Sequence, residues 1–447
     1  MDGIIIFSQV VPKAVETDYV TGDTWRYNPQ SRIVALDPEK PGRSLIVLTA
    51  GYYSAGSPDI SYDGKLMLFA GQQKQNDPWQ IWEMNLENLK IKQVTSSVEN
   101  STDPVYLPVG RVLYSKLTMD DSLKTGHSLY TCNPDGSDIK RITFNPATYY
   151  ASTVLKDGRV LTISRQLYPD QGDQQFIVLR PDGTKAELFY KGIDGSSLSS
   201  RALETINGKI VFVESDKKGN RGGNVISINY NRPLHSRVNL TSEIIGDFQT
   251  VFPLSSGRLI VSYRKSDADR YGLYEFDPET KSLGKAIYSN KDYDASDVVV
   301  VGKHQMPKKL PSEVDMGVKT GLLLCQDINL SGMLSSFNGG SSKASRIEVV
   351  GIDSTLGVVQ VEKDGSFYLK VIADTPFRIR TIDEKGNVLN GTCDWIWLRP
   401  NERRGCIGCH ENLELVPDNR VPLAVKNLPV NIPVHISKVV EKKVSLE

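Results

Sequence analysis

The sequence predicts an all-β protein: a six-bladed β-propeller followed by a small β-sandwich domain with an extended C-terminal tail. Two observations support this prediction. A strand–turn–strand unit recurs in steps of 47 to 49 residues, and no helical periodicity separates its copies. After the sixth copy, predicted strands continue but the period is lost. The chain is therefore expected to change from a repeat architecture to a different β domain.

The repeated unit occurs six times in the first part of the chain. Its copies begin at Ile33, Ile81, Leu129, Phe176, Val225 and Leu273. Most copies turn at clusters of Asp, Asn, Pro and Gly, and the returning strand often ends in Thr, as at Thr143. Another hairpin precedes most copies, with turns such as Asp63-Gly64 that supply the positive φ of tight hairpins. Four short strands in each repeat are typical of propeller blades.

The first and last strands of this region predict how the propeller closes. The strand at residues 4–8 has no strand before it, and the strand at 295–301 has no hairpin partner after it. We expect these two strands to pair, because a closed ring leaves no strand edge exposed.

Long polar loops are predicted between the second and third strands of every blade. They span residues 11–31, 71–77, 116–126, 165–174, 216–223 and 264–271. All blades run in the same direction, so these loops are expected to lie on one face. A redox or protein partner binding there is one interpretation, and ordinary solvated loops are the alternative. Trp25, Trp79 and His127 are the candidates for such contacts, although Trp79 could simply pack against the start of its strand.

Residues 303–316 predict an interdomain linker, because two prolines and three lysines interrupt the pattern between Lys303 and Pro311. His304 and Met306 are possible iron ligands by chemistry, but we expect them to be linker residues. We therefore divide the chain into a propeller (1–302), this linker, a β-sandwich (317–400) and a final segment with an extended tail (401–447).

The β-sandwich is predicted from strands that alternate apolar and polar residues. They lie at residues 322–327, 346–350, 357–362, 366–371, 377–383 and 395–398. Val361, Phe367, Leu369 and Val371 are expected to point inward, since alternate residues of a strand share one face.

The stretch Cys406-Ile407-Gly408-Cys409-His410 has the C-x-x-C-H pattern by which a c-type haem is attached. Two thiols three positions apart can bond the two vinyl groups of a porphyrin, and the adjacent histidine can then ligate the iron. The alternatives are a redox dithiol, a turn with a local disulfide, or a zinc site that also uses Cys393. The sequence holds five cysteines, too few for a disulfide framework, so Cys132, Cys325 and Cys393 are expected to be buried.

Residues around this motif predict two further properties. Arg403 and Arg404 are expected to pair with the haem propionates, because guanidinium groups match carboxylates; ordinary exposed arginines are the alternative. A second strong iron ligand is scarce, since Met333 is the last methionine and only His435 follows His410. We therefore expect an open iron position or a ligand from far along the chain.

Composition excludes several classes of function. Lys plus Arg and Asp plus Glu both number 53, so the chain has no net charge that would favour nucleic acid or an anionic membrane. No apolar run approaches the roughly 20 residues of a transmembrane helix. Met1-Asp2-Gly3 leads directly into a predicted strand, so we expect no signal peptide within this numbering. Haem attachment takes place outside the bacterial cytoplasm, so we expect a periplasmic or extracellular protein whose leader has been removed.

Several stretches resemble known proteins. The blade segment at residues 57–65, Ser-Pro-Asp-Ile-Ser-Tyr-Asp-Gly-Lys, is similar to the repeat of TolB-type propellers. Further along come a proline-containing linker, Gly321-Leu322-Leu323-Leu324, the Asp364-Gly365-Ser366-Phe367 turn, Thr375-Pro376-Phe377, and the motif preceded by Arg403-Arg404-Gly405. This order resembles proteins related to the alpha subunit of hydrazine synthase.

The resemblance implies that Cys406 and Cys409 hold one haem c and that His410 lies beside the iron. It does not imply hydrazine synthesis, because the family's complex uses more haems and partner subunits than one such chain offers. The leading interpretation is a secreted or periplasmic mono-haem protein that acts in electron transfer or redox-linked binding. The alternatives are a haem-free propeller scaffold or binding protein with a structural cysteine pair or zinc site, and a haem enzyme with an open iron position. No catalytic residue is identified.

Overall fold

The chain folds into two compact units, Met1–Ser312 and Glu313–Glu447. A computed structural model describes residues 3–12, 27–120, 123–216, 222–330, 343–391, 393–408 and 419–434. Within these ranges nearly all regular structure is β-sheet, and the helical segments are the short 3-10 turns η1 (Pro233–His235) and η2 (Leu423–Lys426). None of the described helices has the length and apolarity that crossing a membrane requires.

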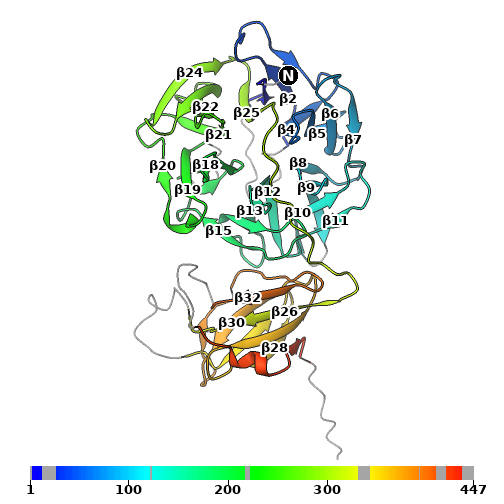
Figure 1. The fold of residues 1–447 in the computed structure, drawn as a ribbon, viewed down its shortest axis with the longest axis vertical. Coiled ribbons are helices and arrows are strands. Elements are labelled where there is room, and N and C mark those ends of the chain that lie inside the picture. Colours follow the sequence, from blue (N-terminus) through cyan, green and yellow to red (C-terminus); the bar gives the residue numbers. More distant parts are fainter. Residues whose placement is uncertain are drawn as a thin grey trace, which may run out of the picture. The chain divides into compact units, whose positions relative to one another are not determined.

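The first unit is a β-propeller whose sheets, the blades, are arranged around a central axis (Figure 1). From the axis outward, the first blade contains β25 (Asp294–Val300), β1 (Ile5–Val10), β2 (Arg32–Leu36) and β3 (Ile46–Val47). The second blade contains β4 (Ser54–Ile60), β5 (Leu66–Gln72), β6 (Gln80–Asn85) and β7 (Ile91–Gln93). The third contains β8 (Ser101–Tyr106), β9 (Val112–Asp120), β10 (Leu123–Cys132) and β11 (Lys140–Arg141).

Three more blades complete the ring in the order of the sequence. The fourth blade contains β12 (Ala147–Val154), β13 (Val160–Gln166), β14 (Gln174–Leu179) and β15 (Glu187–Lys191). The fifth contains β16 (Ser197–Leu198) and β17 (Leu203–Glu204) as its innermost part, then β18 (Lys209–Ser215), β19 (Asn224–Asn229) and β20 (Val238–Asn239). The sixth contains β21 (Asp247–Pro253), β22 (Leu259–Arg264), β23 (Gly272–Asp277) and β24 (Ser282–Tyr288). The prediction of a six-bladed propeller is confirmed.

The ring closes within the first blade. Strand β1 pairs antiparallel with β2 on one side and with β25 on the other, and Ile5 faces Leu36 and Val300. Ile6 and Phe7 in β1 are fully buried. The predicted pairing of the first and last strands is therefore present, and it joins the two ends of the propeller in one sheet.

The threonines that end several outer strands have a structural role. The side-chain oxygens of Thr49, Thr95, Thr143 and Thr241 accept hydrogen bonds of 2.8–3.0 Å from backbone N–H groups of the third strand of the same blade. All four threonines are buried. Because the fourth strand stops at this point, the hydroxyl takes the place of a ladder partner and leaves no buried donor unsatisfied.

Two predicted details of the blades differ in the structure. The loop expected at residues 116–126 is mostly strand, because β9 and β10 continue past it and pair as far as Asp120 and Leu123. In the fifth blade the innermost strand is divided into β16 and β17. Arg201 lies between these two strands, and its guanidinium donates to backbone carbonyls of Pro58 and Pro104 in other blades.

The second unit contains two four-stranded sheets. One has the order β32 (Arg403–Cys406), β26 (Thr320–Cys325), β29 (Phe367–Ile372) and β33 (Val430–Ile432); the other has β28 (Thr355–Gln360), β27 (Arg346–Val350), β30 (Arg378–Ile382) and β31 (Val388–Asn390). The Asp364-Gly365 turn passes the chain from one sheet to the other. Phe367, Leu369 and Val371 are buried in the core between the sheets, as predicted, and Val361 packs at its border.

The C-terminal part of this unit differs from a simple extension. The strand expected at 395–398 is only an isolated bridge between Phe377 and Ile396, because buried Trp395 and Trp397 serve as core side chains of a loop. Strands β32 and β33 instead complete the first sheet, each pairing in parallel with its neighbour. Part of the predicted motif segment and tail is therefore built into the domain.

Candidate functional site

The first cysteine of the C-x-x-C-H motif lies at the end of edge strand β32. This strand runs parallel to β26 in a register that places Arg404 beside Leu323 and Cys406 beside Cys325. Side chains alternate along β32, so Arg403 and Gly405 are exposed, while Arg404 and Cys406 are partly buried. Cys406 packs against the core of the unit. Cys409 and His410 lie outside the described residues.

After Cys406 the chain stays close to the segment that follows β26. The N–H of Gln326 donates to the carbonyl of Cys406 (2.9 Å), and the N–H of Asp327 donates to that of Ile407 (3.1 Å). A Cβ atom on Gly408 would lie 1.8 Å from the carbonyl oxygen of Leu330, so this approach requires glycine. Packing therefore determines one of the two residues between the motif cysteines.

The chain that emerges after the motif is anchored to the same region. Arg420 forms an ion pair with Asp364 (2.5 Å) and a longer one with Asp327 (3.6 Å). The backbone N–H of Leu423 also donates to Asp364 (2.8 Å). Sequence reasoning missed this anchor, because nothing in the local pattern pairs an arginine of the tail with carboxylates of two distant turns. Ile407 and Arg420, which lie on either side of residues 409–418 in the sequence, thus both contact Asp327.

The Asp364 carboxyl is the centre of this anchor. Burial alone would raise the pKa of this carboxyl. It also accepts hydrogen bonds from the Ser366 hydroxyl and from the N–H groups of Leu423 and Ser366, and it lies beside the charge of Arg420. Together these interactions outweigh burial and lower the pKa below its usual range. A carboxyl whose pKa is lowered by folding stabilises the folded state above its ordinary pKa of about 3.9. That contribution is lost as the pH falls through the lower, folded-state pKa.

We therefore expect the stability of the second unit to depend on Asp364 at neutral pH and much less in acid. Asp364→Asn should lower the free energy of unfolding at pH 7, and the difference from wild type should shrink below about pH 4. Denaturant titrations of both proteins at several pH values measure this difference in the free energy of unfolding. Asp353→Asn, on an exposed turn, is the matched control. A difference that stays constant down to strongly acid pH would contradict the role of the carboxylate.

The two arginines before the motif have different environments. Arg404 donates two hydrogen bonds to one oxygen of Glu402 (2.7 and 2.9 Å), whose side chain is fully buried. The other Glu402 oxygen accepts the backbone N–H of Arg399 (2.8 Å). Arg403 is exposed on the opposite face of the strand. The pairing of these arginines with propionates stays a prediction, and Arg403 is the more accessible of the two.

The other cysteines are held in packed surroundings. Cys132 and Cys325 are buried, as expected, and burial raises the pKa of the Cys132 thiol to about 11, which makes it unreactive. Cys393 was expected to be buried but is partly exposed, and its sulfur accepts the N–H of Ile379 (3.2 Å). In the described part of the chain, no three His, Cys, Asp or Glu side chains converge as a metal site.

The candidate contacts on the loop face are buried side chains. Trp79 and His127 are 5% and 2% exposed, and Tyr27 packs against both rings. The Tyr27 hydroxyl and His127 Nε2 are 2.5 Å apart. These residues stabilise the bases of their loops instead of presenting a surface. Trp25 lies outside the described residues.

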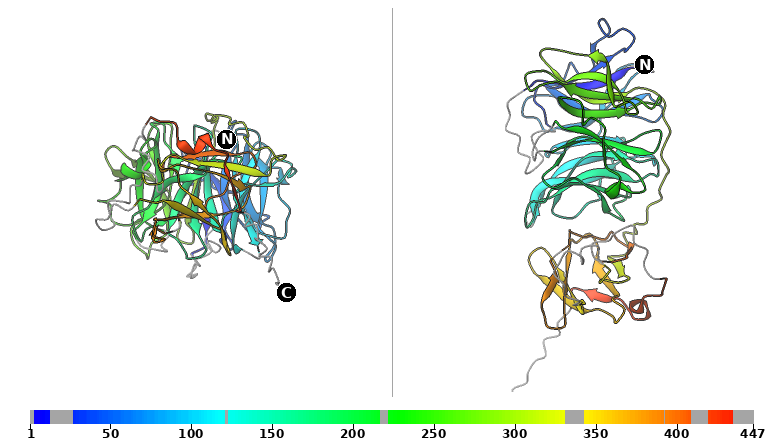
Figure 2. Two further views of the ribbon diagram at one scale, coloured as in Figure 1. Left: turned by 90° about the horizontal axis from the view of Figure 1, so that it is seen from below. Right: turned by 90° about the vertical axis from the view of Figure 1, so that its left-hand side faces the viewer.

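The opposite end of the propeller axis contains a cavity of about 510 Å³, the axial cavity. The C-terminal ends of the innermost strands surround it, and the strap, residues 302–311, runs over this face (Figures 1 and 2). The strap is held by hydrogen bonds from the His304 N–H to Tyr62 (3.1 Å) and from the Lys308 N–H to Lys156 (3.0 Å). His304 and exposed Met306 therefore lie in a segment bound to the propeller.

Arg201 ties three blades together beside the axial cavity. Its guanidinium donates to the carbonyls of Pro58 and Pro104, both at 3.1 Å, and lies 3.7 Å from the Asp59 carboxylate. Burial raises the pKa of Asp59, although Arg201 and the N–H of Tyr106 partly offset this effect. The arrangement places a cation beside a partly buried carboxylate and links the fifth blade to the second and third.

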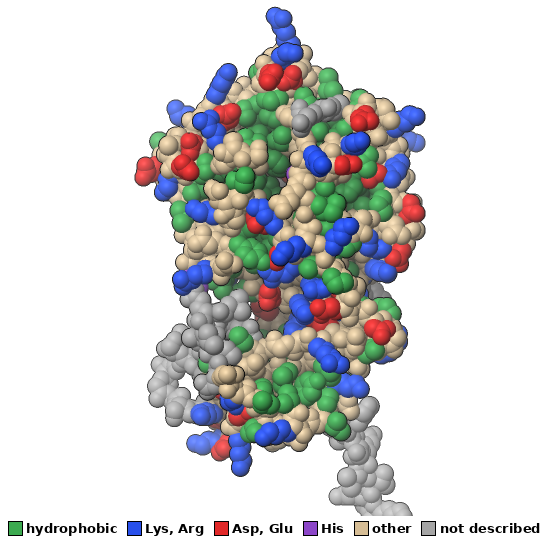
Figure 3. All heavy atoms as spheres, viewed as in Figure 1, with side chains coloured by type: hydrophobic (Ala, Val, Ile, Leu, Met, Phe, Trp, Pro, Cys, Tyr) green, Lys and Arg blue, Asp and Glu red, His purple; other side chains and the backbone are tan. Residues whose placement is uncertain are grey.

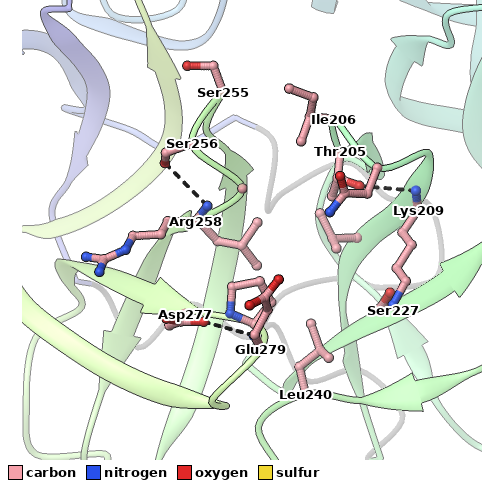
Figure 4. Close-up of a pocket in the computed structure, with 15 residues that line it drawn as sticks. Thr205, Ile206, Lys209, Ser227, Leu240, Ser255, Ser256, Arg258, Asp277 and Glu279 are labelled. Carbon is pink, nitrogen blue, oxygen red and sulfur yellow. Dashed lines mark hydrogen bonds between the residues drawn. The ribbon is translucent and has the colours of Figure 1, made fainter.

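A second hollow of about 390 Å³ lies between the fifth and sixth blades (Figure 4). Turns and strand residues line it, and the hydrogen bonds drawn there lie within turns, such as that from the N–H of Glu279 to Asp277 (2.9 Å). Positive and negative side chains are interspersed over the face shown in Figure 3. Neither feature selects a ligand of one charge.

Together these features define a class: a closed six-bladed β-propeller joined to a two-sheet domain that carries the beginning of a C-x-x-C-H segment. Residues 325–411 match the family model described as the hydrazine synthase alpha subunit middle domain. The chain is also 23% identical to hydrazine synthase subunit alpha of Kuenenia stuttgartiensis, over 86% of this chain. The resemblance predicted from the sequence is confirmed.

Solved structures extend the comparison. The Kuenenia stuttgartiensis hydrazine synthase structure superposes with a TM-score of 0.82 at 21% identity and covers 96% of this chain and 72% of that one. The crystal structure of TolB from Acinetobacter baumannii gives a TM-score of 0.47 at 14% identity, over 67% of this chain and 66% of that one. The chain spans 63% of the length of its curated relative.

Proposed function

We propose that this chain is a mono-haem c-type protein of the periplasm or extracellular space that acts in electron transfer or redox-linked binding. In this proposal Cys406 and Cys409 form the two thioether bonds and His410 contributes its imidazole to the iron. The observation that carries the proposal is the family match over 325–411, which includes the whole motif. The location follows because this attachment chemistry takes place outside the bacterial cytoplasm.

The described residues are compatible with such a group. Cys406 is partly exposed at the end of β32, whereas Cys325 opposite it is buried. The lack of a side chain at Gly408 allows the motif to lie close to the Leu330 carbonyl, and Arg420 forms an ion pair with Asp364. Arg403 is available for a propionate. When bound, a haem supplies one-electron redox chemistry.

The proposal does not extend to hydrazine synthesis. That activity is the one for which the relative is named, and this chain is 23% identical to that relative and covers 63% of its length. Fold and motif are what the two chains share. The specific chemistry of the iron depends on axial ligands and on the surrounding polarity.

Production of the chain with an export signal in a bacterium that matures c-type cytochromes tests the proposal. We expect a Soret band that persists after acid–acetone extraction, and an intact mass increased by one haem. The double variant Cys406→Ser, Cys409→Ser should lose both. Cys132→Ser, which changes a buried cysteine of the propeller, should keep both.

Colourless, unmodified wild-type protein from the same host would contradict the proposal. It would favour the haem-free scaffold or binding protein in which the cysteine pair is structural. A haem that washes out in acid–acetone would instead indicate non-covalent binding, and it would equally exclude the thioether bonds.

A further inference from the structure

Cys406 has a second sulfur beside it that does not belong to the C-x-x-C-H motif. The parallel pairing of β26 with β32 places Cys325 directly opposite Cys406. The N–H of Gln326 donates to the Cys406 carbonyl (2.9 Å), which confirms this register one residue further on. Residues opposite each other in a parallel ladder point to the same face of the sheet. Both side chains accordingly contact the same core cluster.

The spacing of paired strands suits a disulfide. Neighbouring strands lie about 4.7–4.9 Å apart, and the Cα atoms of a disulfide are usually about 4.4–6.8 Å apart. Both residues carry thiols in the structure. Among the described strands β32 pairs with β26 alone, so a shift of β32 would disturb one described ladder. A bond between the two sulfurs would therefore need only a small local shift.

We propose that Cys325 and Cys406 form a reversible disulfide in the chain before cofactor attachment, and that this bond withholds Cys406 from thioether formation. The first half stands on the strand pairing alone, and the second half rests on the proposed function. The site is thus a redox-sensitive modification site in which one cysteine has two mutually exclusive uses.

Accessibility assigns the order of the chemical steps. Cys406 is partly exposed and Cys325 is 1% exposed, so an external disulfide oxidant R–S–S–R meets Cys406 first. The Cys406 thiolate attacks one sulfur of the oxidant, forms a mixed disulfide and releases one R–S⁻. The Cys325 thiolate then attacks the Cys406 sulfur and releases the second R–S⁻. Two thiol protons go to the leaving thiolates, and the oxidant gains the two electrons that the cysteines lose.

The same geometry explains why Cys325 differs from the other cysteines outside the motif. Cys132 is buried in the propeller unit, and Cys393 accepts a hydrogen bond from Ile379 near the other sheet of the second unit. In the ladder pairings of the described strands, Cys325 is the residue paired with a motif cysteine. It is therefore the resolving cysteine that the fold supplies.

The test uses wild-type protein without haem, produced in the cytoplasm and exposed to oxidised glutathione. Remaining thiols are blocked with N-ethylmaleimide, and a non-reducing digest is analysed by mass spectrometry. We expect a peptide pair linked through Cys325 and Cys406 that disappears on reduction. In Cys325→Ser this pair should be lost and Cys406 should carry glutathione instead. Cys132→Ser should give the wild-type pattern.

Wild-type protein that shows a Cys406–Cys409 link alone, or no link, would overturn the proposal. A second arm compares the fraction of chains with attached haem between wild type and Cys325→Ser, in a maturing host under oxidising conditions. A higher fraction in the variant is expected, and equal fractions would overturn the competition. If the Cys325–Cys406 link forms but neither protein acquires haem, the proposed function fails while the disulfide stands.

Discussion

Removal of residues 1–10 is expected to prevent the propeller from closing and to make the chain aggregate. Strand β1 lies between β25 and β2, so its loss separates the last strand of the propeller from the first blade. It also removes fully buried Ile6 and Phe7. The strand edges left on both neighbours would template association with other chains. The soluble fraction and size-exclusion profile should show aggregates in place of a monodisperse peak.

A matched control changes the other edge of the same blade. Ile46→Ser with Val47→Ser alters outer strand β3, whose side chains are 46% and 37% exposed. This variant should stay soluble and folded, since exposed substitutions usually change stability by about 0.5 kcal/mol or less. A truncated chain that is monomeric and unfolds cooperatively like wild type would show that closure does not depend on β1.

Replacement of Glu402 by alanine is expected to destabilise the second unit by about 3–5 kcal/mol, the cost of removing one partner of a buried ion pair. Its carboxylate accepts two hydrogen bonds from Arg404 and one from the Arg399 backbone. The Glu402 side chain is fully buried and that of Arg404 is 12% exposed. Without the carboxylate, the Arg404 guanidinium still carries the cost of being removed from water but no longer has the hydrogen bonds and opposite charge that offset that cost.

Chemical denaturation followed by tryptophan fluorescence measures this effect, because Trp395 and Trp397 are buried in the same unit. Glu402→Gln keeps the shape and should cost less than alanine. Arg403→Ala, one residue away on the exposed face, should change the free energy of unfolding by about 0.5 kcal/mol or less. Equal effects of Glu402→Ala and Arg403→Ala would show that the buried pair is not the source of stability.

Much of the propeller was predictable because its signals are local and repeated. A period near 48 residues, with turn residues at fixed places, indicates blades even when individual strand ends are uncertain. Unpaired strands at both ends of the repeat indicated closure, because a ring leaves no open edge. The strand at 395–398 was predicted wrongly, since apolar residues such as Trp395 and Trp397 also occur in buried loops. Apolar content alone does not distinguish a strand from a buried loop.

The sequence by itself determined the repeat, its closure, and a C-x-x-C-H pattern whose chemistry depends on spacing along the chain. Tertiary structure alone decided which distant residues meet. It paired Cys325 with Cys406, anchored Arg420 on Asp364, and placed Arg201 across the propeller. The physical reason is that strand register between segments far apart in sequence is set by the packing of a shared core. Local patterns report only which face of its own strand a residue occupies.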